Sequence, residues 1–216
     1  KKGIVCDNKN DLLRVYDQYD VFKGNLLLQD LIPGEESRLV SSLITLNKES
    51  YPTGYLINYK RRSSGKFLSC TVVASTWSDE VLNYSLKLLK AIGYYGYAGT
   101  QFKLDPRNGK YTLMEINGRI TMSNSMGIKC GINFPFLMYN EAIDENNKVI
   151  INYERFYPEN IVWIYLAGDI LSLIRNHLYL KPFQYIKSLM GQKYIIEPLS
   201  LNDPIRYFKS LIKLFI

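Results

Sequence analysis

Apolar and polar residues alternate with two different periods along the first two thirds of the chain. Short apolar runs bounded by turn residues predict strands over 26–32, 36–46, 53–61, 67–75, 96–105 and 111–117. Apolar residues at helical spacing predict helices over 8–19, 78–92, 125–129 and 136–143. Because short loops join most of these strands, the sheet should be mostly antiparallel, with helices flanking it. The pattern therefore predicts an α/β (α+β) fold.

The composition of the sequence changes at the polar stretch "DENNK", residues 144–148. Beyond it the chain is rich in Tyr, Leu, Ile and Lys, with helical periodicity and few glycines. We therefore expect one domain over residues 1–144 and a mainly helical C-terminal extension over residues 145–216.

Composition narrows the functional classes only partly. The formal net charge of +7 favours an anionic partner, such as a nucleotide, nucleic acid or membrane surface, without choosing among them. Three widely spaced cysteines argue against a disulfide framework and a zinc ribbon, so a cytoplasmic setting is the simplest interpretation. The only histidine, His177, has no nucleophile motif beside it, and no apolar stretch is long enough to predict a transmembrane segment.

The stretch "YTLMEINGR", residues 111–119, holds the strongest candidate chemistry. Glu115 and Asn117 are two residues apart, so on a strand both side chains lie on one face. The turn residues "PRNGK" predict a hairpin between 96–105 and 111–117, and this hairpin would bring Gln101 close to both. One carboxylate and two amide oxygens suit Mg²⁺, which completes its shell with water and phosphate oxygens, and Arg119 would then lie near those phosphates. The alternative is an ordinary strand whose polar residues only face solvent.

The order of several motifs resembles the ATP-grasp superfamily, and in particular the carbamoyl phosphate synthetase-like carboxylate–amine ligases. "LLLQDLIPGEE" is similar to the strand that holds adenine, and "YKRRSSG" to the arginine-bearing strand that faces the transferred phosphate. The stretch from Gly93 to Arg119 resembles the metal-binding hairpin, and "CGINFP" the closing turn. The resemblance covers residues 1–140 and implies the C-terminal portion of the fold, without the phosphate-clamping lysines that precede it.

The resemblance also implies roles for individual residues. Residues Gln29, Asp30 and Ile32 would line an adenine pocket, Glu36 would bind the ribose, and Lys103 would contribute on the nucleotide or substrate side. Mg²⁺, with Mn²⁺ as an alternative, would be held by Gln101, Glu115 and Asn117. Catalytic contacts to phosphate would come from Arg119, Arg61 and Arg62. The chain departs from the common pattern at Gln101, where glutamate is frequent, and at Gly118, where proline is usual.

These expectations lead to an ATP-dependent ligase that joins a small carboxylate to an amine through an acyl phosphate, here as a C-terminal fragment that is inactive alone. A homodimer is left open, nucleic acid is not an expected partner, and no transmembrane segment is expected. The competing interpretations are a non-catalytic nucleotide-binding or regulatory module and a binder of nucleic acid or membrane surfaces driven by positive charge.

Overall fold

The computed structural model describes residues 3–19, 24, 26–65, 69–143, 156–175, 193–197 and 205. The chain divides into two compact units, Lys1–Pro33 and Gly34–Ile216. His177 and much of the predicted C-terminal extension lie outside the described residues. None of the described helices is long and apolar enough to cross a membrane.

Among the described residues of the first unit, one segment is helical, α1 (Lys9–Gln18), as the apolar spacing predicts. The Asn8 side chain caps it by accepting a hydrogen bond from the Asp11 backbone N–H at 2.9 Å. The prediction of a strand over 26–32 is wrong, because the structure assigns no strand to these residues and pairs them with none of the described strands. Leu27 is 88% exposed, whereas Ile32 is buried.

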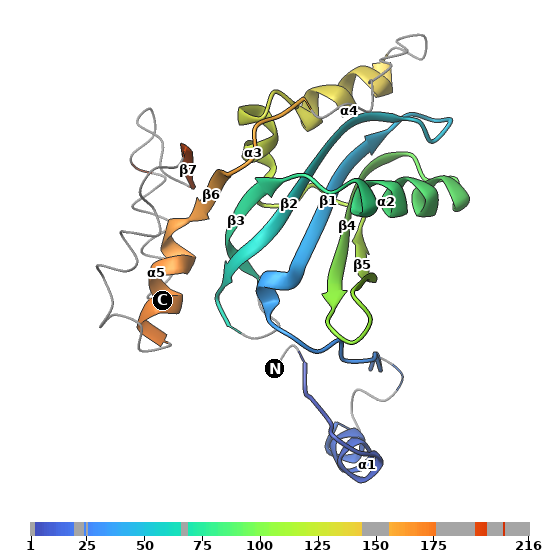
Figure 1. The fold of residues 1–216 in the computed structure, drawn as a ribbon, viewed down its shortest axis with the longest axis vertical. Coiled ribbons are helices and arrows are strands. Elements are labelled where there is room, and N and C mark those ends of the chain that lie inside the picture. Colours follow the sequence, from blue (N-terminus) through green and yellow to red (C-terminus); the bar gives the residue numbers. More distant parts are fainter. Residues whose placement is uncertain are drawn as a thin grey trace. The chain divides into compact units, whose positions relative to one another are not determined.

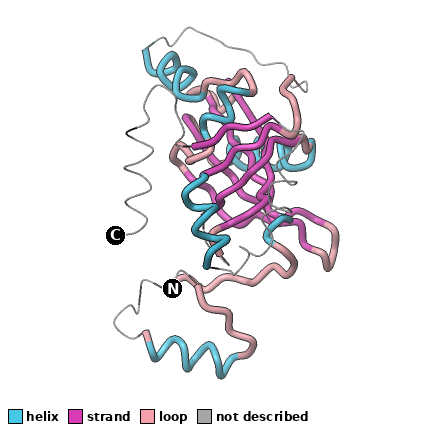
Figure 2. The backbone as a smooth tube through the Cα atoms, turned by 90° about the vertical axis from the view of Figure 1, so that its left-hand side faces the viewer, coloured by secondary structure: helices cyan, strands magenta, loops and turns pink. Residues whose placement is uncertain are grey.

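The second unit is built on one seven-stranded sheet with the order β5-β4-β1-β2-β3-β6-β7, most of which Figure 1 shows as adjacent ribbons. All neighbouring pairs are antiparallel except β6 and β7. The strands are β1 (Leu39–Leu46), β2 (Pro52–Ser63), β3 (Cys70–Thr76), β4 (Gly96–Asp105), β5 (Lys110–Asn117), β6 (Ile161–Tyr165) and β7 (Lys193–Glu197). The predicted fold class, a mostly antiparallel sheet flanked by helices, is confirmed (Figure 2).

The two faces of the sheet are covered differently. Helix α2 (Asp79–Ala91) packs on the face that carries Thr100, and the Ser85 hydroxyl meets the Thr100 hydroxyl at 2.8 Å. We call this the α2 face, and the opposite one the Gln101 face. Helices α3 (Asn124–Lys129) and α4 (Phe134–Ile143) lie together near one end of the sheet (Figure 1).

Contacts from α4 show that it covers one end of the Gln101 face. A Cβ added to Gly54 of β2 would lie 2.5 Å from Leu137 Cδ1, so only glycine allows α4 to approach this closely. The Tyr97 and Phe134 rings also meet edge to face, with centroids 5.5 Å apart. The other end of this face, around Gln101, carries the polar residues.

Strands occur where the sequence predicts mainly helix. In the described part of residues 145–216, β6 and β7 extend the sheet, and only α5 (Leu166–Arg175) is an α-helix of more than one residue. The run "IVWIY" of β6 is apolar at every position and buried at its first four. A short continuous apolar run has no period that separates a strand from a helix, so the sequence pattern could not assign it.

Candidate functional site

The predicted hairpin is confirmed. Strands β4 and β5 pair antiparallel, with Gln101 opposite Glu115 and Gly99 opposite Asn117. Directly opposite residues in such a pair have Cβ atoms about 5 Å apart and share a face, so Gln101 and Glu115 are side-by-side neighbours. The Asn117 amide donates a hydrogen bond to Glu115 Oε1 at 2.8 Å. The structure therefore brings the three predicted metal ligands together on the Gln101 face.

The donor set fits a hard cation. Glu115 is exposed, and Gln101 and Asn117 are half-buried, so an ion can reach all three from solvent. One carboxylate with amide oxygens suits Mg²⁺ when water and phosphate supply the other ligands. The Asn117 amide would turn to present its oxygen, a rotation that exchanges its O and N positions. The described residues hold no cluster of three or more His, Cys, Asp or Glu side chains suited to a metal.

Two buried lysines flank these ligands. Lys103 lies two residues beyond Gln101 on β4, therefore on the same face, and donates to the Gly34 carbonyl at 2.8 Å. Leu39 of β1 pairs with Lys103 of β4. On the other side of β1, Val40 pairs with Tyr59 of β2, so the next residue of β2, Lys60, lies beside Leu39. Lys60 and Lys103 are 7% and 8% exposed. Two ammonium groups at this end of one face make it attractive to an anion.

The structure places Glu36 against Lys60. Glu36 begins the short 3₁₀ helix η2 (Glu36–Arg38), and its carboxylate forms an ion pair with the Lys60 ammonium. The Ser63 hydroxyl donates to the same carboxylate oxygen at 2.7 Å. A carboxylate held by two donors is fixed in position, which suits the ribose contact predicted for it.

Electrostatics connect this pair with the metal ligands. Burial raises the pKa of the Cys70 thiol, the Lys60 charge lowers it, and the charges of Glu36 and Glu115 raise it. Cys70 therefore lies within electrostatic reach of all three groups. Sequence analysis missed Lys60, although strand alternation gave a signal: in "NYKRR", Lys60 lies on the face of Asn58 and opposite to Tyr59.

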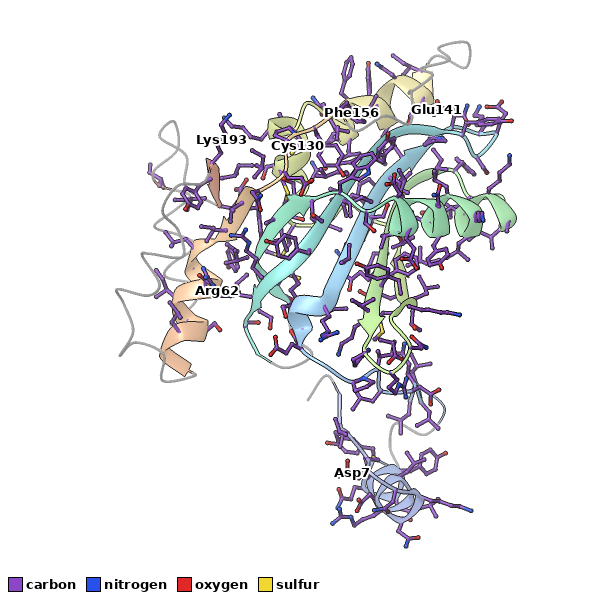
Figure 3. The ribbon with its side chains drawn as sticks, viewed as in Figure 1. Asp7, Arg62, Cys130, Glu141, Phe156 and Lys193 are labelled. Carbon is purple, nitrogen blue, oxygen red and sulfur yellow. The ribbon has the colours of Figure 1, made fainter. Side chains whose placement is uncertain are left out.

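The structure does not bring Arg62 to the Gln101 face. Arg62 of β2 pairs in register with Val72 of β3, and Val72 packs beside Tyr59 on the α2 face. Its guanidinium binds both oxygens of Asp169 in α5, at 3.0 and 2.8 Å, and Asp169 is 1% exposed. Figure 3 shows Arg62 on the side of the sheet next to α5.

Arg61 is the extra residue of an irregularity in β2. It donates to the Tyr59 hydroxyl at 2.9 Å and to Asn160 Oδ1 at 3.3 Å. The catalytic roles suggested for Arg61 and Arg62 stay predictions, and both arginines have protein partners in the structure.

Arg119 follows β5 after Gly118 and is exposed. Burial raises the pKa of the Tyr97 hydroxyl, and hydrogen bonds with Thr121 and the Arg119 charge lower that pKa in part. Tyr97 is on the Gln101 face, two residues before Gly99. The contact of Arg119 with phosphate stays a prediction.

The residues predicted to line an adenine pocket belong to the first unit. Gln29 and Asp30 are exposed there and Ile32 is buried. Their roles stay predictions, as do those of Glu36 and Lys103.

Comparison with known families supports this assignment of the fold. Residues 70–136, which run from β3 into α4, match the model described as the carbamoyl-phosphate synthase L chain, ATP binding domain. A curated D-aspartate ligase from Enterococcus faecium is 26% identical over 145 residues, which is 62% of this chain and 33% of the relative. The chain thus spans about a third of the length of that relative.

Solved structures share the fold at low sequence identity. A biotin carboxylase domain dimer of the Hydrogenobacter thermophilus 2-oxoglutarate carboxylase, in complex with MgADP, ADP and bicarbonate, is 18% identical with a TM-score of 0.55, over 75% of this chain and 37% of its own. Pyruvate carboxylase from Rhizobium etli is 18% identical with a TM-score of 0.56, and the match covers 75% of this chain and 16% of that structure. The biotin carboxylase–beta-gamma-ATP complex from Campylobacter jejuni is 15% identical with a TM-score of 0.54, and the match covers 75% of this chain and 37% of that structure.

The family model matches the part of the chain that carries the predicted resemblance, and the solved structures share the fold. Residues 70–136 contain the hairpin and the closing turn on which that prediction rests. We conclude that residues 70–136 are similar to the ATP binding domain of the carbamoyl-phosphate synthase L chain and that the chain shares the fold of biotin carboxylases.

Proposed function

We propose that this chain is the metal- and phosphate-binding part of an ATP-dependent ligase that joins a carboxylate to an amine through an acyl phosphate. The observation that carries the proposal is the convergence of Gln101, Glu115 and Asn117 on one face of the β4–β5 hairpin. The match to an ATP-binding family model and the similarity to a D-aspartate ligase support it. The name of that relative suggests an amino acid as one substrate.

The site residues have distinct roles in this proposal. Mg²⁺, or Mn²⁺ in its place, supplies charge compensation for the ATP phosphates when it is bound. Gln101, Glu115 and Asn117 hold that ion, and Glu115 contributes the carboxylate of the set. Arg119 offsets charge on the transferred phosphoryl group, because a fixed guanidinium stabilises an anion that develops next to it. Glu36 binds the ribose, while Gln29, Asp30 and Ile32 line the adenine pocket.

The lysines complete the anion site. Lys103 and Lys60 lie on the same face as the proposed ligands and are buried, so their charges act through a poorly screened environment. In this position they orient the phosphates or the substrate carboxylate. Lys60 thereby takes the role on this face that the sequence suggested for Arg61 and Arg62.

The reaction balances in two steps. A carboxylate oxygen attacks the γ-phosphorus of ATP, the bond from that phosphorus to the β–γ bridging oxygen breaks, and ADP leaves. The amine nitrogen then attacks the acyl carbon, the carbon–oxygen bond to phosphate breaks, and the nitrogen loses a proton to the medium. Inorganic phosphate leaves with one oxygen that began in the carboxylate.

That oxygen provides the test. The protein with full ligase activity is incubated with ATP, an amine and an amino acid labelled with ¹⁸O in its carboxylate, and the phosphate is analysed by mass spectrometry. We expect one ¹⁸O atom in each phosphate released. Phosphate without label would mean that water takes the phosphoryl group, which would refute the acyl phosphate. ATP binding without turnover would favour a non-catalytic nucleotide-binding module. A cytoplasmic location and a homodimer stay predictions.

A further inference from the structure

A cavity of about 260 Å³ lies on the α2 face, on the opposite side of the sheet from the proposed metal ligands. Val40, which lines the cavity, is in register with Phe102, whose ring lies 6.3 Å from that of Tyr84 in α2. Leu104 of β4 also lines the cavity. Nothing in the proposed ligase reaction uses this space.

Aromatic side chains form the walls. Tyr59, Trp77 and Tyr111 line the cavity and are half-buried. Trp77 is held from two sides, because its Nε1 donates to Asp79 Oδ1 at 3.1 Å and its ring lies 5.5 Å from that of Tyr157. Rigid aromatic walls favour a flat ligand that stacks on them. A cavity of 150 Å³ holds benzene, and drug-sized ligands need 300 Å³ or more, so about 260 Å³ suits one or two fused rings.

Charge at the cavity favours an anion. Arg38 of η2 lines it and is exposed, and its guanidinium has no ion pair within the described part of the chain. The Arg61 guanidinium lies over the Tyr59 ring, 5.4 Å from the ring centroid. The nearby Asp79 carboxylate already accepts the Trp77 hydrogen bond. A planar carboxylate would stack between the rings and meet Arg38.

The cavity and the proposed nucleotide site share a backbone. Strand alternation sends consecutive residues to opposite faces, so the cavity residues Tyr59 and Leu104 are next in sequence to Lys60 and Lys103. In η2, Ser37 lines the cavity and follows Glu36 directly. A ligand that shifts these strands or η2 from the α2 face therefore moves the charged groups on the Gln101 face.

We propose that this cavity is a second binding site, which takes a small planar aromatic carboxylate and is coupled through β2, β4 and η2 to the face that carries Lys60 and Lys103. Binding of one ligand would then change the affinity for the other by the same factor in both directions. This inference goes beyond the ligase activity, and its binding test does not require that activity.

The test uses the two indole N–H signals in a ¹H–¹⁵N NMR spectrum of the labelled chain. Trp77 lines the cavity, whereas Trp163 is buried in the core, so one signal reports on the cavity and the other serves as an internal control. Trp77→Phe assigns the signals and keeps an aromatic wall. The probes are 1-naphthoate and its neutral isostere 1-naphthamide. We expect 1-naphthoate to shift the Trp77 signal saturably, to leave that of Trp163 in place, and to bind about tenfold more tightly than the amide.

Two variants locate the anion contact. Arg38→Gln should reduce the affinity for 1-naphthoate to that for 1-naphthamide. Lys90→Gln removes a charge from the far end of α2, where Lys90 lies over the Tyr51 ring, and should change neither affinity. A Trp77 signal that does not saturate at millimolar 1-naphthoate, or equal affinity for both probes, would overturn the site. Spectral dispersion equal to that of the parent chain confirms that each variant is folded.

The coupling has its own readout. Saturating 1-naphthoate should shift the backbone amide signals of Glu36, Lys60 and Lys103, whereas amide signals of β7 should stay in place. Unchanged signals at these three residues, with the Trp77 signal saturated, would refute the coupling. Failure of the ¹⁸O experiment would leave both binding results intact, so the two proposals fail separately.

Discussion

Removing the Arg62 guanidinium should destabilise the second unit strongly, because it pairs with a buried carboxylate. Asp169 is 1% exposed and accepts two bonds from Arg62 and one from the Thr71 hydroxyl at 2.8 Å. In Arg62→Leu, the buried Asp169 carboxylate loses both hydrogen bonds from this guanidinium. Breaking a buried pair in this way costs 3–5 kcal/mol. Since the Arg62 side chain is 26% exposed, water screens the pair in part, and we expect about 3 kcal/mol.

The neighbouring arginine is the matched control. Arg61 donates to the Tyr59 hydroxyl and to Asn160 Oδ1 and stacks on the Tyr59 ring, and these three contacts involve uncharged groups. Arg61→Leu should therefore cost about 1 kcal/mol. The double variant Arg62→Leu with Asp169→Leu removes both charges and should recover much of the loss, since an apolar pair can replace a buried ion pair.

Urea denaturation followed by far-UV circular dichroism measures these free energies of unfolding, with the slope checked for constancy between variants. A loss below about 1 kcal/mol for Arg62→Leu, or a loss equal to that of Arg61→Leu, would refute the structural role of the pair. In that case Arg62 would be available for the phosphate contact that the sequence suggested. The experiment thus decides between the two roles of one arginine.

Three further predictions use other parts of the fold. In the protein with ligase activity, Glu115→Gln should lower the rate of ADP release by about a hundredfold, with an unchanged melting temperature, because it removes the carboxylate of the metal site. Gln101→Glu should retain activity. If Glu115→Gln released ADP at the parent rate, the metal assignment would be refuted. The Ser42 hydroxyl is buried with no hydrogen-bond partner among the described residues, whereas the Ser85 hydroxyl bonds the Val81 carbonyl and the Thr100 hydroxyl. In the same urea assay, Ser42→Ala should therefore be neutral or stabilising, and Ser85→Ala should cost about 1 kcal/mol. Equal losses of stability in the two variants would contradict this assignment. Burial raises the pKa of the Cys130 thiol to about 11, above its unfolded value, so its stabilising contribution is complete below about pH 9 and is lost as the pH rises through 11. Cys130→Ala should lose stability less steeply over that range in pH-dependent thermal melts, and parallel curves would contradict the assignment.

The parts of the fold that the sequence predicted well are those with local signals. Strand β4 has the predicted bounds, and the turn "PRNGK" joins it to β5 as its residue types indicate. Helix α2 begins after Ser78, whose side chain accepts a hydrogen bond from the Val81 N–H, with Asp79 and Glu80 in the first turn. Each of these features depends on neighbouring residues only, so a single sequence contains the information.

The parts that were missed depend on distant residues. The segment 26–32 has a strand composition, but a strand also needs a neighbour, which the sequence pattern does not supply. Strand β6 is the converse case, because its place beside β3 depends on a partner some ninety residues earlier. Arg62 looked like a free surface or catalytic cation until Asp169 appeared beside it, 107 residues away along the chain. Long-range partners of this kind leave no local period or motif.

The site itself depends on one irregularity that no sequence pattern revealed. From the turn onward, Asp105 pairs with Lys110 and Phe102 with Leu113, a register that would place Gln101 opposite Met114. In that register Glu115 would lie opposite Thr100 and face α2. Met114 is instead the extra residue of a β-bulge, which shifts the pairing by one, so Glu115 and Asn117 lie on the Gln101 face. A one-residue shift exchanges the faces of a strand, so the bulge is the feature that joins a carboxylate from one strand to an amide from the next. The i, i+2 spacing of Glu115 and Asn117 ensured that they share a face, and the bulge determined which face that is.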